Sequence, residues 1–361
     1  MRVGIISMQR IFNYGSLLQA FSLKSVLESR GHTVTFVDIE SSPKVQVKRK
    51  GFDFSKLKYV DKYLFRRLKY SKKNKLLNVV FRENQEKYLG LTQEHMGSDG
   101  CDAVVIGSDE IFNCAPDSKW GVTAQRFGYI PGVDLVVSYA ASCGYTGVEY
   151  LTEQDRKVIK AALENMKGIS VRDQNTADFV LGLTGRQPNM NLDPVLIYDQ
   201  FEAQYAPYEG SVPKEPYMVV YAYHNRIDTK EEIEAIQKYA KKHHLKTIAI
   251  GGSLPWCDDF AVLSPFEVLA YFKHAACIVT DTFHGTIFSA KLRKPFAVIV
   301  RDSNKKKLDD LLTRLKITNH KVADMSRLER VLEQKDDLNA CHEVIAEGRE
   351  QAYRFLESVG L

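Results

Sequence analysis

Two hydrophobic patterns alternate along the chain. Short continuous apolar runs predict buried strands, and longer segments with apolar residues at helical spacing predict helices between them. The predicted strands cover 2–8, 33–39, 102–107, 135–140, 168–171, 217–223, 246–251, 277–280 and 295–300. The predicted helices cover 15–30, 152–166, 173–181, 229–242, 265–274, 285–292, 305–316, 327–333 and 339–358. This alternation is typical of parallel sheets that helices cover on both faces.

A stretch rich in proline and glycine interrupts the alternation near the middle of the chain. It covers residues 199–216 and holds three prolines, which favour turns over regular elements. We therefore predict an α/β protein with two doubly wound, Rossmann-like domains, residues 1–205 and 206–361, that face a cleft. Ligands of open α/β sheets bind beyond the carboxyl ends of the strands, so polar residues that follow strands are the candidate site.

The composition excludes several classes of protein. Of the 361 residues, 44% are hydrophobic and 26% are charged, which excludes collagen-like and wholly disordered chains. No apolar run approaches the ~18 residues of a membrane-spanning helix. The first residues lack the features of a signal peptide, and the six cysteines show no zinc-binding spacing. We therefore expect a cytoplasmic protein with reduced thiols and without a metal.

The net charge of +5 hides one strongly basic segment. Residues 44–75 hold 13 lysines and arginines but two acids, so the rest of the chain is acidic overall. Aromatic residues are interleaved with these cations, a combination suited to an anionic membrane, a nucleic acid or an anionic polymer. A helical insertion near 44–88 whose apolar face packs on its own domain explains the pattern equally well, because charge runs are usually solvated faces.

Two loops of the first half carry polar residues directly after predicted strands. The first loop lacks the GxGxxG fingerprint of dinucleotide-binding folds and instead presents Asn13 and Tyr14 at the start of a helix. The second loop carries Asp109, Glu110 and Asn113, and adjacent acids can orient or deprotonate a sugar hydroxyl. The alternatives are a purely structural turn in the first loop, and helix capping by Asp109 or the serine before it in the second.

Charged or titratable residues stand at three later strand ends. Arg172 ends a short apolar strand, where an arginine can bind phosphate or carboxylate with two hydrogen bonds, although a surface ion pair with Asp173 is an alternative. Asp193 has the pattern of a cap in a turn. His284 lies in a tight polar turn between a strand and a helix, where an imidazole can transfer protons near neutral pH.

These motifs occur together in one order that resembles the polysaccharide pyruvyl transferase family. The matching segments are NYGSLLQAFSLKSVLESRGH at 13–32, DAVVIGSDEIFN at 102–113, SYAASCG at 138–144, ISVRD at 169–173, LDPVL at 192–196 and SPFEVLAYFKHAACIVTDTFHGTIFSAKLRKPFAVI at 264–299. The resemblance implies a GT-B-like architecture in which the last helix returns to the N-terminal domain. It also implies transfer of the pyruvyl group of phosphoenolpyruvate to two hydroxyls of one sugar, which forms a pyruvate ketal and releases phosphate.

The resemblance also assigns roles to particular residues. It implies that His284 is the general acid and that Arg172, Thr282 and Gly285 bind the donor, whose side of the cleft is assigned to the C-terminal domain. Family members place a lysine after the strand that corresponds to PFAVI, and here both Arg301 and Lys305 are candidates for that role. The acceptor side is assigned to the N-terminal domain, with the following residues: Asn13, Tyr14, Asp109, Glu110 and Asn113.

The expected function is therefore a pyruvyl transferase of surface-polysaccharide or exopolysaccharide synthesis. Phosphoenolpyruvate is its co-substrate, no cofactor or metal is expected, and the partner is a saccharide that is free or lipid-linked. Contact between residues 44–75 and the inner face of an anionic membrane is a further hypothesis, whereas no nucleic acid is expected. Two other functions stay open on the same fold, namely a glycosyltransferase that uses a nucleotide sugar and a non-catalytic saccharide- or membrane-binding protein.

Overall fold

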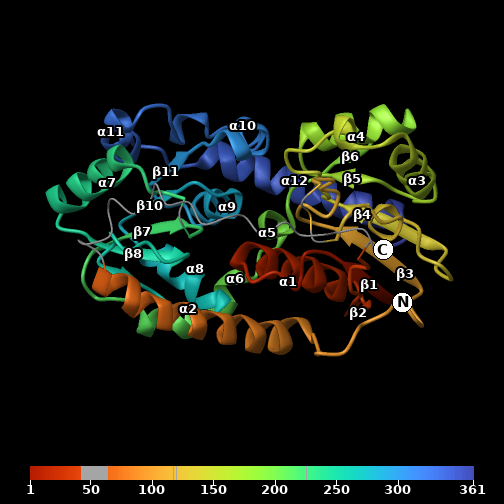
Figure 1. Ribbon diagram of the computed structural model, residues 1–361, viewed down its shortest axis with the longest axis horizontal. Coiled ribbons are helices and arrows are strands. Elements are labelled where there is room, and N and C mark those ends of the chain that lie inside the picture. Colours follow the sequence, from red (N-terminus) through yellow and green to blue (C-terminus); the bar gives the residue numbers. More distant parts are fainter. Residues whose placement is uncertain (42–63, 117, 119, 225) are drawn as a thin grey trace.

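The first half of the chain forms a parallel sheet with a short extension at one edge. The computed structural model describes residues 1–41, 64–116, 118, 120–224 and 226–361. Four strands lie in the order β2-β1-β3-β4 (Figure 1). Their bounds are β1 (Arg2–Ile6), β2 (Thr33–Phe36), β3 (Ala103–Gly107) and β4 (Leu135–Tyr139). Single bridges from β4 and from the residues after it lead to β5 (Ser170–Val171), which pairs with β6 (Asn189–Met190).

Helices follow the strands of this half as the hydrophobic pattern predicts. They are α1 (Tyr14–Ser29), α3 (Glu153–Glu164) and α4 (Gln174–Thr184). Each begins at a side chain that accepts backbone N–H groups, and at α1 this side chain is Asn13, which accepts from Gly15 and Ser16. Such capping satisfies donors that the first helical turn would otherwise leave unpaired. The caps therefore fix where each helix begins relative to the strand before it.

The second half forms a larger parallel sheet. Its strand order is β12-β11-β10-β7-β8-β9, and every pairing in it is parallel. The strands are β7 (Tyr217–Ala222), β8 (Lys246–Gly251), β9 (Asp259–Phe260), β10 (Cys277–Thr280), β11 (Phe296–Ile299) and β12 (Lys321–Val322). The helices are α7 (Lys230–Lys242), α8 (Pro265–His274), α9 (Phe283–Lys291), α10 (Lys305–Arg314) and α11 (Leu328–Glu333). The two sheets confirm the predicted α/β class.

The stretch between the sheets is more ordered than its prolines suggest. It contains α5 (Pro194–Ile197), α6 (Phe201–Tyr205) and a 3₁₀ segment (Ala206–Ser211). Phe201 and Tyr205 are buried, and the Phe201 ring lies 6.5 Å from Phe266 of α8. The expectation of turns without regular elements is thus wrong here, because aromatic residues between the prolines pack on the second half. The exact domain boundary at 205/206 stays a prediction.

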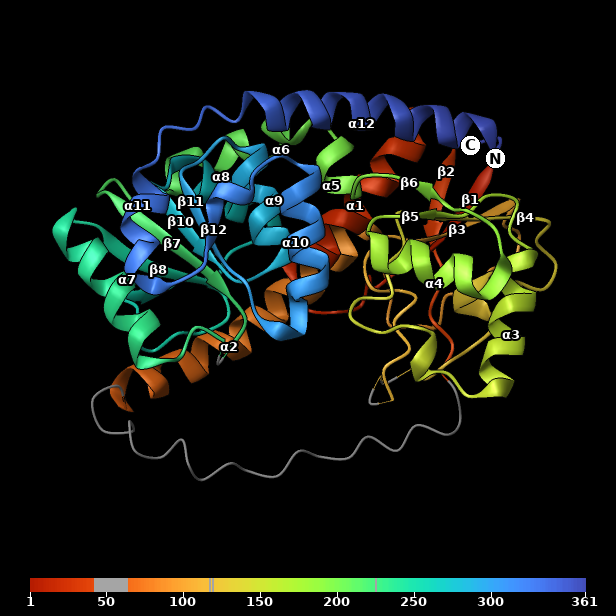
Figure 2. The same ribbon diagram turned by 90° about the horizontal axis from the view of Figure 1, so that it is seen from above.

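The last helix, α12 (Asn339–Ser358), runs from the second half back across the first (Figure 2). Phe355 packs with its ring centroid 6.4 Å from Tyr139 of β4. The Arg30 Nε donates to the carbonyl oxygen of Leu361 at 3.0 Å, so the end of the chain lies against the end of α1. The two halves are therefore joined twice, once through α5 and α6 and once through α12.

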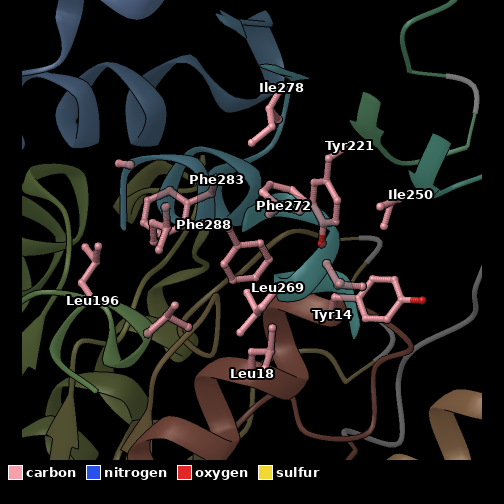
Figure 3. Close-up of a cluster of buried hydrophobic side chains, with 14 of the residues drawn as sticks. Tyr14, Leu18, Leu196, Tyr221, Ile250, Leu269, Phe272, Ile278, Phe283 and Phe288 are labelled. Carbon is pink, nitrogen blue, oxygen red and sulfur yellow. The ribbon is translucent and has the colours of Figure 1, made fainter. Parts of the chain in front are cut away.

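A continuous apolar core lies where the two halves meet. One cluster of buried residues includes Leu18 of α1, Leu196 of α5, Leu269 of α8 and Phe288 of α9 (Figure 3). Burial of side chains of this size contributes roughly 1.5–3 kcal/mol each. This shared core fixes the N-terminal ends of helices from the two halves relative to one another. The candidate site is built on these helix ends.

The described part of the basic segment is the helix α2 (Leu64–Asn84), which continues into a π-helical turn (Gln85–Leu89). The hypothesis that its apolar face packs on its own domain is confirmed near the end of this helix, where the Phe81 ring lies 5.7 Å from Phe12 and 4.7 Å from Tyr14. It is wrong for the first part of the helix, whose inner face meets the C-terminal sheet. Lys73 Nζ lies 2.8 Å from an Asp259 carboxylate oxygen, and the Tyr70 hydroxyl donates to the Cys257 carbonyl oxygen at 3.3 Å. Most of the basic segment, residues 44–63, lies outside the described residues.

All six cysteines are buried and none forms a disulfide. Burial raises the pKa of Cys114 and of Cys277 to about 12, so these thiols stay protonated and unreactive at neutral pH. Among the described residues, the longest helices carry too many charged and polar side chains to cross a bilayer.

Candidate active site

A cleft of about 480 Å³ opens between the two halves, beyond the carboxyl ends of their strands. Its volume falls within the roughly 300–1,000 Å³ of small-molecule sites. The first half contributes loops after β1, β3 and β5, and the second contributes residues that follow β7, β10 and β11. Its polar lining consists of Asn13, Ser16, Asp109, Glu110, Asn113, Arg172, Tyr223, His284 and Lys307.

Four of the site residues form one buried charged group, the cleft cluster of Asp109, Arg172, Asp193 and His284. Arg172 Nη1 lies 2.8 Å from Asp193 Oδ2, and Arg172 Nη2 lies 3.2 Å from Asp109 Oδ1. The Nε2 atom of His284 is 3.5 Å from the same Asp193 oxygen. One carboxylate thus connects an arginine of the first half with a histidine of the second.

Arg172 is a buried residue rather than a surface one. Its side chain is 1% exposed, and its guanidinium carbon lies 4.3 Å from the centroid of the Phe283 ring. Its Nε atom is buried and has no hydrogen-bond partner among the described residues. The alternative of a surface ion pair with Asp173 is therefore wrong, because Asp173 instead caps α4 through the N–H of Thr176.

Asp193 does more than cap a turn. Its Oδ1 accepts the backbone N–H of Val195 at 3.0 Å, which starts α5, while its Oδ2 faces Arg172 and His284. Burial alone would raise the pKa of Asp193, but His284, Arg172 and the Val195 N–H outweigh burial and lower the pKa to about 2. Asp193 is therefore a carboxylate at neutral pH, and it is tied to the backbone at a fixed place.

His284 is held at the start of α9. Thr282 caps this helix by accepting the Gly285 N–H at 2.9 Å, and His284 follows in the first turn. The ring packs against α1 so closely that a Cβ added to Gly15 would lie 2.1 Å from Nδ1. Nε2 is buried without a hydrogen-bond partner among the described residues, although it faces Asp193. The titratable ring of His284 therefore lies between the two halves, and its Nε2 has no hydrogen-bond partner among the described residues.

A second ion pair crosses the cleft. Lys307 Nζ in α10 lies 2.5 Å from Glu110 Oε1, and the other Glu110 oxygen accepts from Asn113 at 2.9 Å. Burial alone would raise the pKa of Glu110, but Lys307 outweighs burial and the net shift is downward. For Lys307 burial alone would lower the pKa, but the carboxylate of Glu110 outweighs burial and the net shift is upward. Both groups are charged at neutral pH.

Asp109 completes the first wall of the cleft. The Ser16 hydroxyl donates to Asp109 Oδ2 at 2.6 Å, and the backbone φ of Asp109 is +64°. This left-handed conformation is uncommon for a residue with a side chain, and such residues often occur at functional sites. No helix begins at this loop, so the alternative of helix capping is wrong here. Burial favours a higher pKa, but Arg172, His284 and Ser16 together lower the pKa of Asp109.

A sequence model of one protein family matches most of the chain. The model is that of polysaccharide pyruvyl transferases, and it matches residues 13–303, which include every residue of the cleft cluster. The chain belongs to the polysaccharide pyruvyl transferase family. A sequence search of curated proteins finds no match.

Solved structures resemble the whole molecule in fold. The putative UDP-N-acetylglucosamine 2-epimerase from Listeria monocytogenes matches with a TM-score of 0.52 and 11% identity, over 99% of this chain and 95% of that one. Arabidopsis thaliana UGT89C1 complexed with UDP-L-rhamnose matches with a TM-score of 0.50 and 12% identity, over 99% and 97%. At such low identity the likeness establishes the fold alone, which is GT-B-like in this pyruvyl transferase family member.

The cleft contains most of the predicted acceptor residues but not Tyr14. Asn13 donates through Nδ2 to the Tyr223 hydroxyl at 2.8 Å, which bridges the two walls. Tyr14 is instead 1% exposed, and its hydroxyl donates to the Leu263 carbonyl oxygen at 2.7 Å. Figure 3 shows its ring among the buried side chains. The expectation that Tyr14 faces a ligand is wrong, because it belongs to the apolar face of α1.

Of the predicted donor residues in the second half, none lines the cleft. Thr282 and Gly285 are buried, and they shape the turn that carries His284. Arg301 pairs with Asp281 at 3.2 Å and with Glu232 at 2.8 Å. Lys305 is exposed at the first residue of α10. Thr282, Arg301 and Lys305 therefore do not present their side chains to the cleft in this structure, and Gly285 has no side chain to present.

Lys307, Tyr223 and the second role of Asp193 are the features that sequence reasoning missed. Three lysines in succession, residues 305–307, begin α10, and nothing in their spacing singles out the third. Asp193 lies 21 residues from Arg172 in sequence, so only the folded chain brings them together. A position directly after a strand was the one sequence feature that could have indicated a site residue. Tyr223 has such a position, because it directly follows β7.

Among the described residues, one group could offer three ligand atoms to a metal, and it lies outside the cleft. It consists of His243, Glu329 and Glu333 on α7 and α11. The ammonium group of Lys242 already contacts both glutamates. A cation there would have to displace the lysine, so this group supplies no metal to the pyruvyl transferase cleft.

Proposed function

We propose that this protein transfers the pyruvyl group of phosphoenolpyruvate to two hydroxyls of a sugar, with release of phosphate. The observation that carries the proposal is the shared contact of Arg172 and His284 with one Asp193 oxygen, in the cleft of a pyruvyl transferase family member. An arginine can hold the anionic donor, and a histidine next to it can protonate that donor. The acceptor belongs to the synthesis of a surface polysaccharide or exopolysaccharide.

The donor carries a phosphate and a carboxylate, so its site requires cations. Arg172 and Lys307 supply them from opposite walls, and each is already paired with a carboxylate. Donor binding therefore replaces existing ion pairs. The donor would bind the Arg172 guanidinium and the Lys307 ammonium group, which now pair with Asp109 and Glu110. The arginine Nε, which has no hydrogen-bond partner among the described residues, adds a donor that is available without exchange.

The chemistry needs one acid and one base. His284 gives a proton to the CH2 carbon of the donor, which becomes a methyl group and leaves an oxocarbenium-like centre at the neighbouring carbon. A sugar hydroxyl attacks that centre and loses its proton to a carboxylate, for which Glu110 is placed on the acceptor wall. The second hydroxyl then attacks the same carbon, the C–O bond to phosphate breaks, and the proton of this hydroxyl passes to the departing phosphate. The products are the cyclic ketal and inorganic phosphate.

The outer face of α2 supports a peripheral contact with an anionic membrane, which would bring the enzyme to a lipid-linked acceptor at the cytoplasmic face. Leu68, Leu76 and Val79 are 62%, 54% and 46% exposed, and Lys72 and Lys75 are exposed beside them. Their spacing of three, four and eight residues places them on one side of the helix. Apolar side chains among lysines are the pattern of a helix that lies in a bilayer interface.

Vesicle binding tests this contact. Replacing Lys72 and Lys75 by Gln should weaken binding to phosphatidylglycerol vesicles by at least tenfold, since each lysine contributes about 1 kcal/mol near an anionic surface. The matched control replaces Lys230 and Lys238, which are exposed on α7, and should bind as the wild type does. Equal binding of all three proteins, or binding to neutral phosphatidylcholine vesicles alone, would contradict the contact.

The transfer itself is tested with phosphoenolpyruvate and a panel of hexose glycosides. The expected result is phosphate release in step with a product heavier than the acceptor by one pyruvate less one water. Turnover only with a nucleotide sugar, with release of nucleotide, would replace the proposal by a glycosyltransferase. Saccharide binding without turnover of either donor would indicate a binding protein on the same fold.

A further inference from the structure

A second cavity, of about 350 Å³, adjoins the cleft on the side of the first half. Trp120 lines both the cleft and this cavity, so the indole stands at the passage between them. The cavity lies beyond the carboxyl ends of β1 and β2, and its lining includes Gln9, Arg10, Asp38, Gln93 and His95. Nothing in the transfer reaction as described above uses it.

Arg10 and Asp38 of this second cavity are already paired, and Glu94 adds an exposed carboxylate to its lining. Arg10 Nη2 lies 2.8 Å from Asp38 Oδ2, and its Nη1 donates to the Thr92 carbonyl oxygen at 2.8 Å. Burial favours a higher pKa of Asp38, but the hydrogen bond from Arg10 and the Met96 N–H lower it, so the pair stays ionised. A phosphate or carboxylate would compete with Asp38 for this arginine. The cavity therefore suits an uncharged ligand with many hydroxyls better than an anion.

The chemistry of the lining matches a sugar unit. The indole of Trp120 is half-buried, and its face attracts the weakly positive C–H groups on the flat side of a pyranose. Gln93 and His95 are exposed in the same cavity and offer polar atoms to the hydroxyls at the rim of such a ring. A ring stacked on Trp120 would lie next to a ring in the cleft, because this residue lines both spaces.

We infer that the acceptor is at least a disaccharide, whose modified sugar occupies the cleft and whose neighbouring sugar occupies the second cavity against Trp120. The inference rests on the proposed transfer to a saccharide, and it adds the number of sugar units that the site recognises. A single sugar fills only the cleft and forgoes the contacts of the second cavity, so it should be the poorer substrate.

Kinetics with acceptors of two lengths test the inference. Methyl glycosides of glucose, galactose, mannose and N-acetylglucosamine are compared with disaccharides that carry the same sugars at the non-reducing end. For the preferred sugar, kcat/KM should be about tenfold higher for the disaccharide, the worth of one well-placed stacking contact. Trp120→Ala should abolish this ratio, and Trp120→Phe should restore most of it. Tyr129→Ala, at an aromatic residue that is 55% exposed and lines neither space, should keep it.

Fluorescence separates this inference from the proposed reaction. The chain has two tryptophans, and Trp256 is 4% exposed with its indole N–H bound to the Ile227 carbonyl oxygen. In Trp256→Phe the emission comes from Trp120 alone. Without phosphoenolpyruvate, disaccharides should shift that emission at lower concentrations than methyl glycosides, and His95→Ala should reduce the difference without removing it.

The two measurements give distinguishable failures. Equal kcat/KM for both lengths in the wild type, or equal fluorescence responses to both, would overturn the disaccharide inference while transfer itself stands. A length-dependent fluorescence response in a protein that releases no phosphate would uphold the second sugar site and reject the proposed transfer. A ratio that Trp120→Ala and Tyr129→Ala reduce equally would also overturn the inference.

Discussion

Two buried clusters of carboxylates and arginines among the described residues differ in what they face. The cleft cluster (Asp109, Arg172, Asp193 and His284) joins residues that follow β3, β5, β6 and β10, and Asp109, Arg172 and His284 line the cleft. The Asp281 cluster (Arg226, Glu232, Asp281 and Arg301) joins residues that follow β7, β10 and β11 with one residue of α7, and none of its members lines the cleft. Clusters of similar residue types therefore differ in their surroundings, because only one of them faces the cleft.

The carboxylates of the two clusters have opposite pKa shifts. The pKa of Asp193 is lowered to about 2, since its partners outweigh its burial. Burial raises the pKa of Asp281 above its ordinary 3.8, and Arg226 and Arg301 offset only part of that rise. The carbonyl oxygen of Asp281 also accepts from Asn304 at 2.7 Å, just before α10 begins. The Asp281 cluster thus fixes the loop that positions Lys307, whereas three members of the cleft cluster, Asp109, Arg172 and His284, line the cleft.

The largest effect should come from His284→Ala. If His284 protonates the donor, kcat should fall by about 10²–10⁴, the usual worth of a general acid, while the donor KM changes only a few fold. The alkaline limb of the wild-type pH profile should disappear in this variant. The measurement is phosphate release over pH 5–9, with His274→Ala, an exposed histidine on α8, as the control. A folded His284→Ala enzyme with wild-type kcat and an unchanged alkaline limb would assign the proton to another group.

The next largest effect should distinguish the arginines of the two clusters. Arg172→Ala removes charge-assisted hydrogen bonds, each worth roughly 1.5–3 kcal/mol, so the donor KM should rise ten- to hundredfold. Arg301→Ala should leave the donor KM within threefold, because its partners are Asp281 and Glu232. Steady-state kinetics at saturating acceptor measure both, after circular dichroism has shown that each variant is folded. A larger rise in Arg301→Ala than in Arg172→Ala would reverse the roles assigned to the clusters.

A smaller effect should separate the lysines of α10. Lys307→Met should raise the donor KM about fivefold to tenfold, since one exchangeable ion pair near the surface of a cleft is worth about 1 kcal/mol. Lys305→Met, two residues earlier and exposed, should have the kinetics of the wild type. The same assay serves for both. Equal changes in the two variants would indicate a general effect of charge rather than a contact with the donor.

A further effect concerns stability rather than activity, and it comes from Asp193. Its pKa is lower in the folded chain than the ordinary 3.8, so the folded state binds fewer protons than the unfolded state in that interval. The contribution, about 2 kcal/mol, is present above pH 4 and is lost as the pH falls from about 4 to about 2. The free energy of unfolding in urea should therefore drop less over this range in Asp193→Asn than in the wild type. Parallel curves would contradict the lowered pKa.

Asp281→Asn provides the opposite test of the same comparison. The pKa of Asp281 is raised, so its contribution to stability should grow as the pH falls from neutral towards its folded pKa. The wild type should therefore gain relative to Asp281→Asn on mild acidification, whereas it should not gain relative to Asp193→Asn. The sign of the two slopes, measured by urea unfolding at pH 7 and pH 5, distinguishes the clusters without any assay of activity.

Much of the fold follows from local pattern. The predicted helix over 15–30 is α1 (Tyr14–Ser29), and the predicted last helix over 339–358 coincides with α12 (Asn339–Ser358). Both segments are long and contain no proline; α1 begins at a recognisable cap, Asn13, and α12 is amphipathic. The short helices α5 and α6 were not predicted, because four or five residues are too few for a period to show and the nearby prolines favour turns.

The site was only partly predictable, and for physical reasons. Asp109, Glu110, Arg172 and His284 could be found because each follows a strand end. Tyr14 was misplaced, although its spacing of three and four residues from Leu17 and Leu18 marks the buried face of α1. The partners of Arg301 and the second role of Asp193 depend on contacts between distant elements, for which a single sequence carries no local signal.

The central claim is that the cleft cluster, and not the Asp281 cluster, holds the donor. Isothermal titration with phosphoenolpyruvate and no acceptor measures this directly in Arg172→Lys and Arg301→Lys, which keep the charge but lose the two-pronged guanidinium. The account predicts that Arg172→Lys binds the donor at least tenfold more weakly than the wild type, and that Arg301→Lys binds it within threefold. Unchanged binding in Arg172→Lys together with weakened binding in Arg301→Lys would contradict the account.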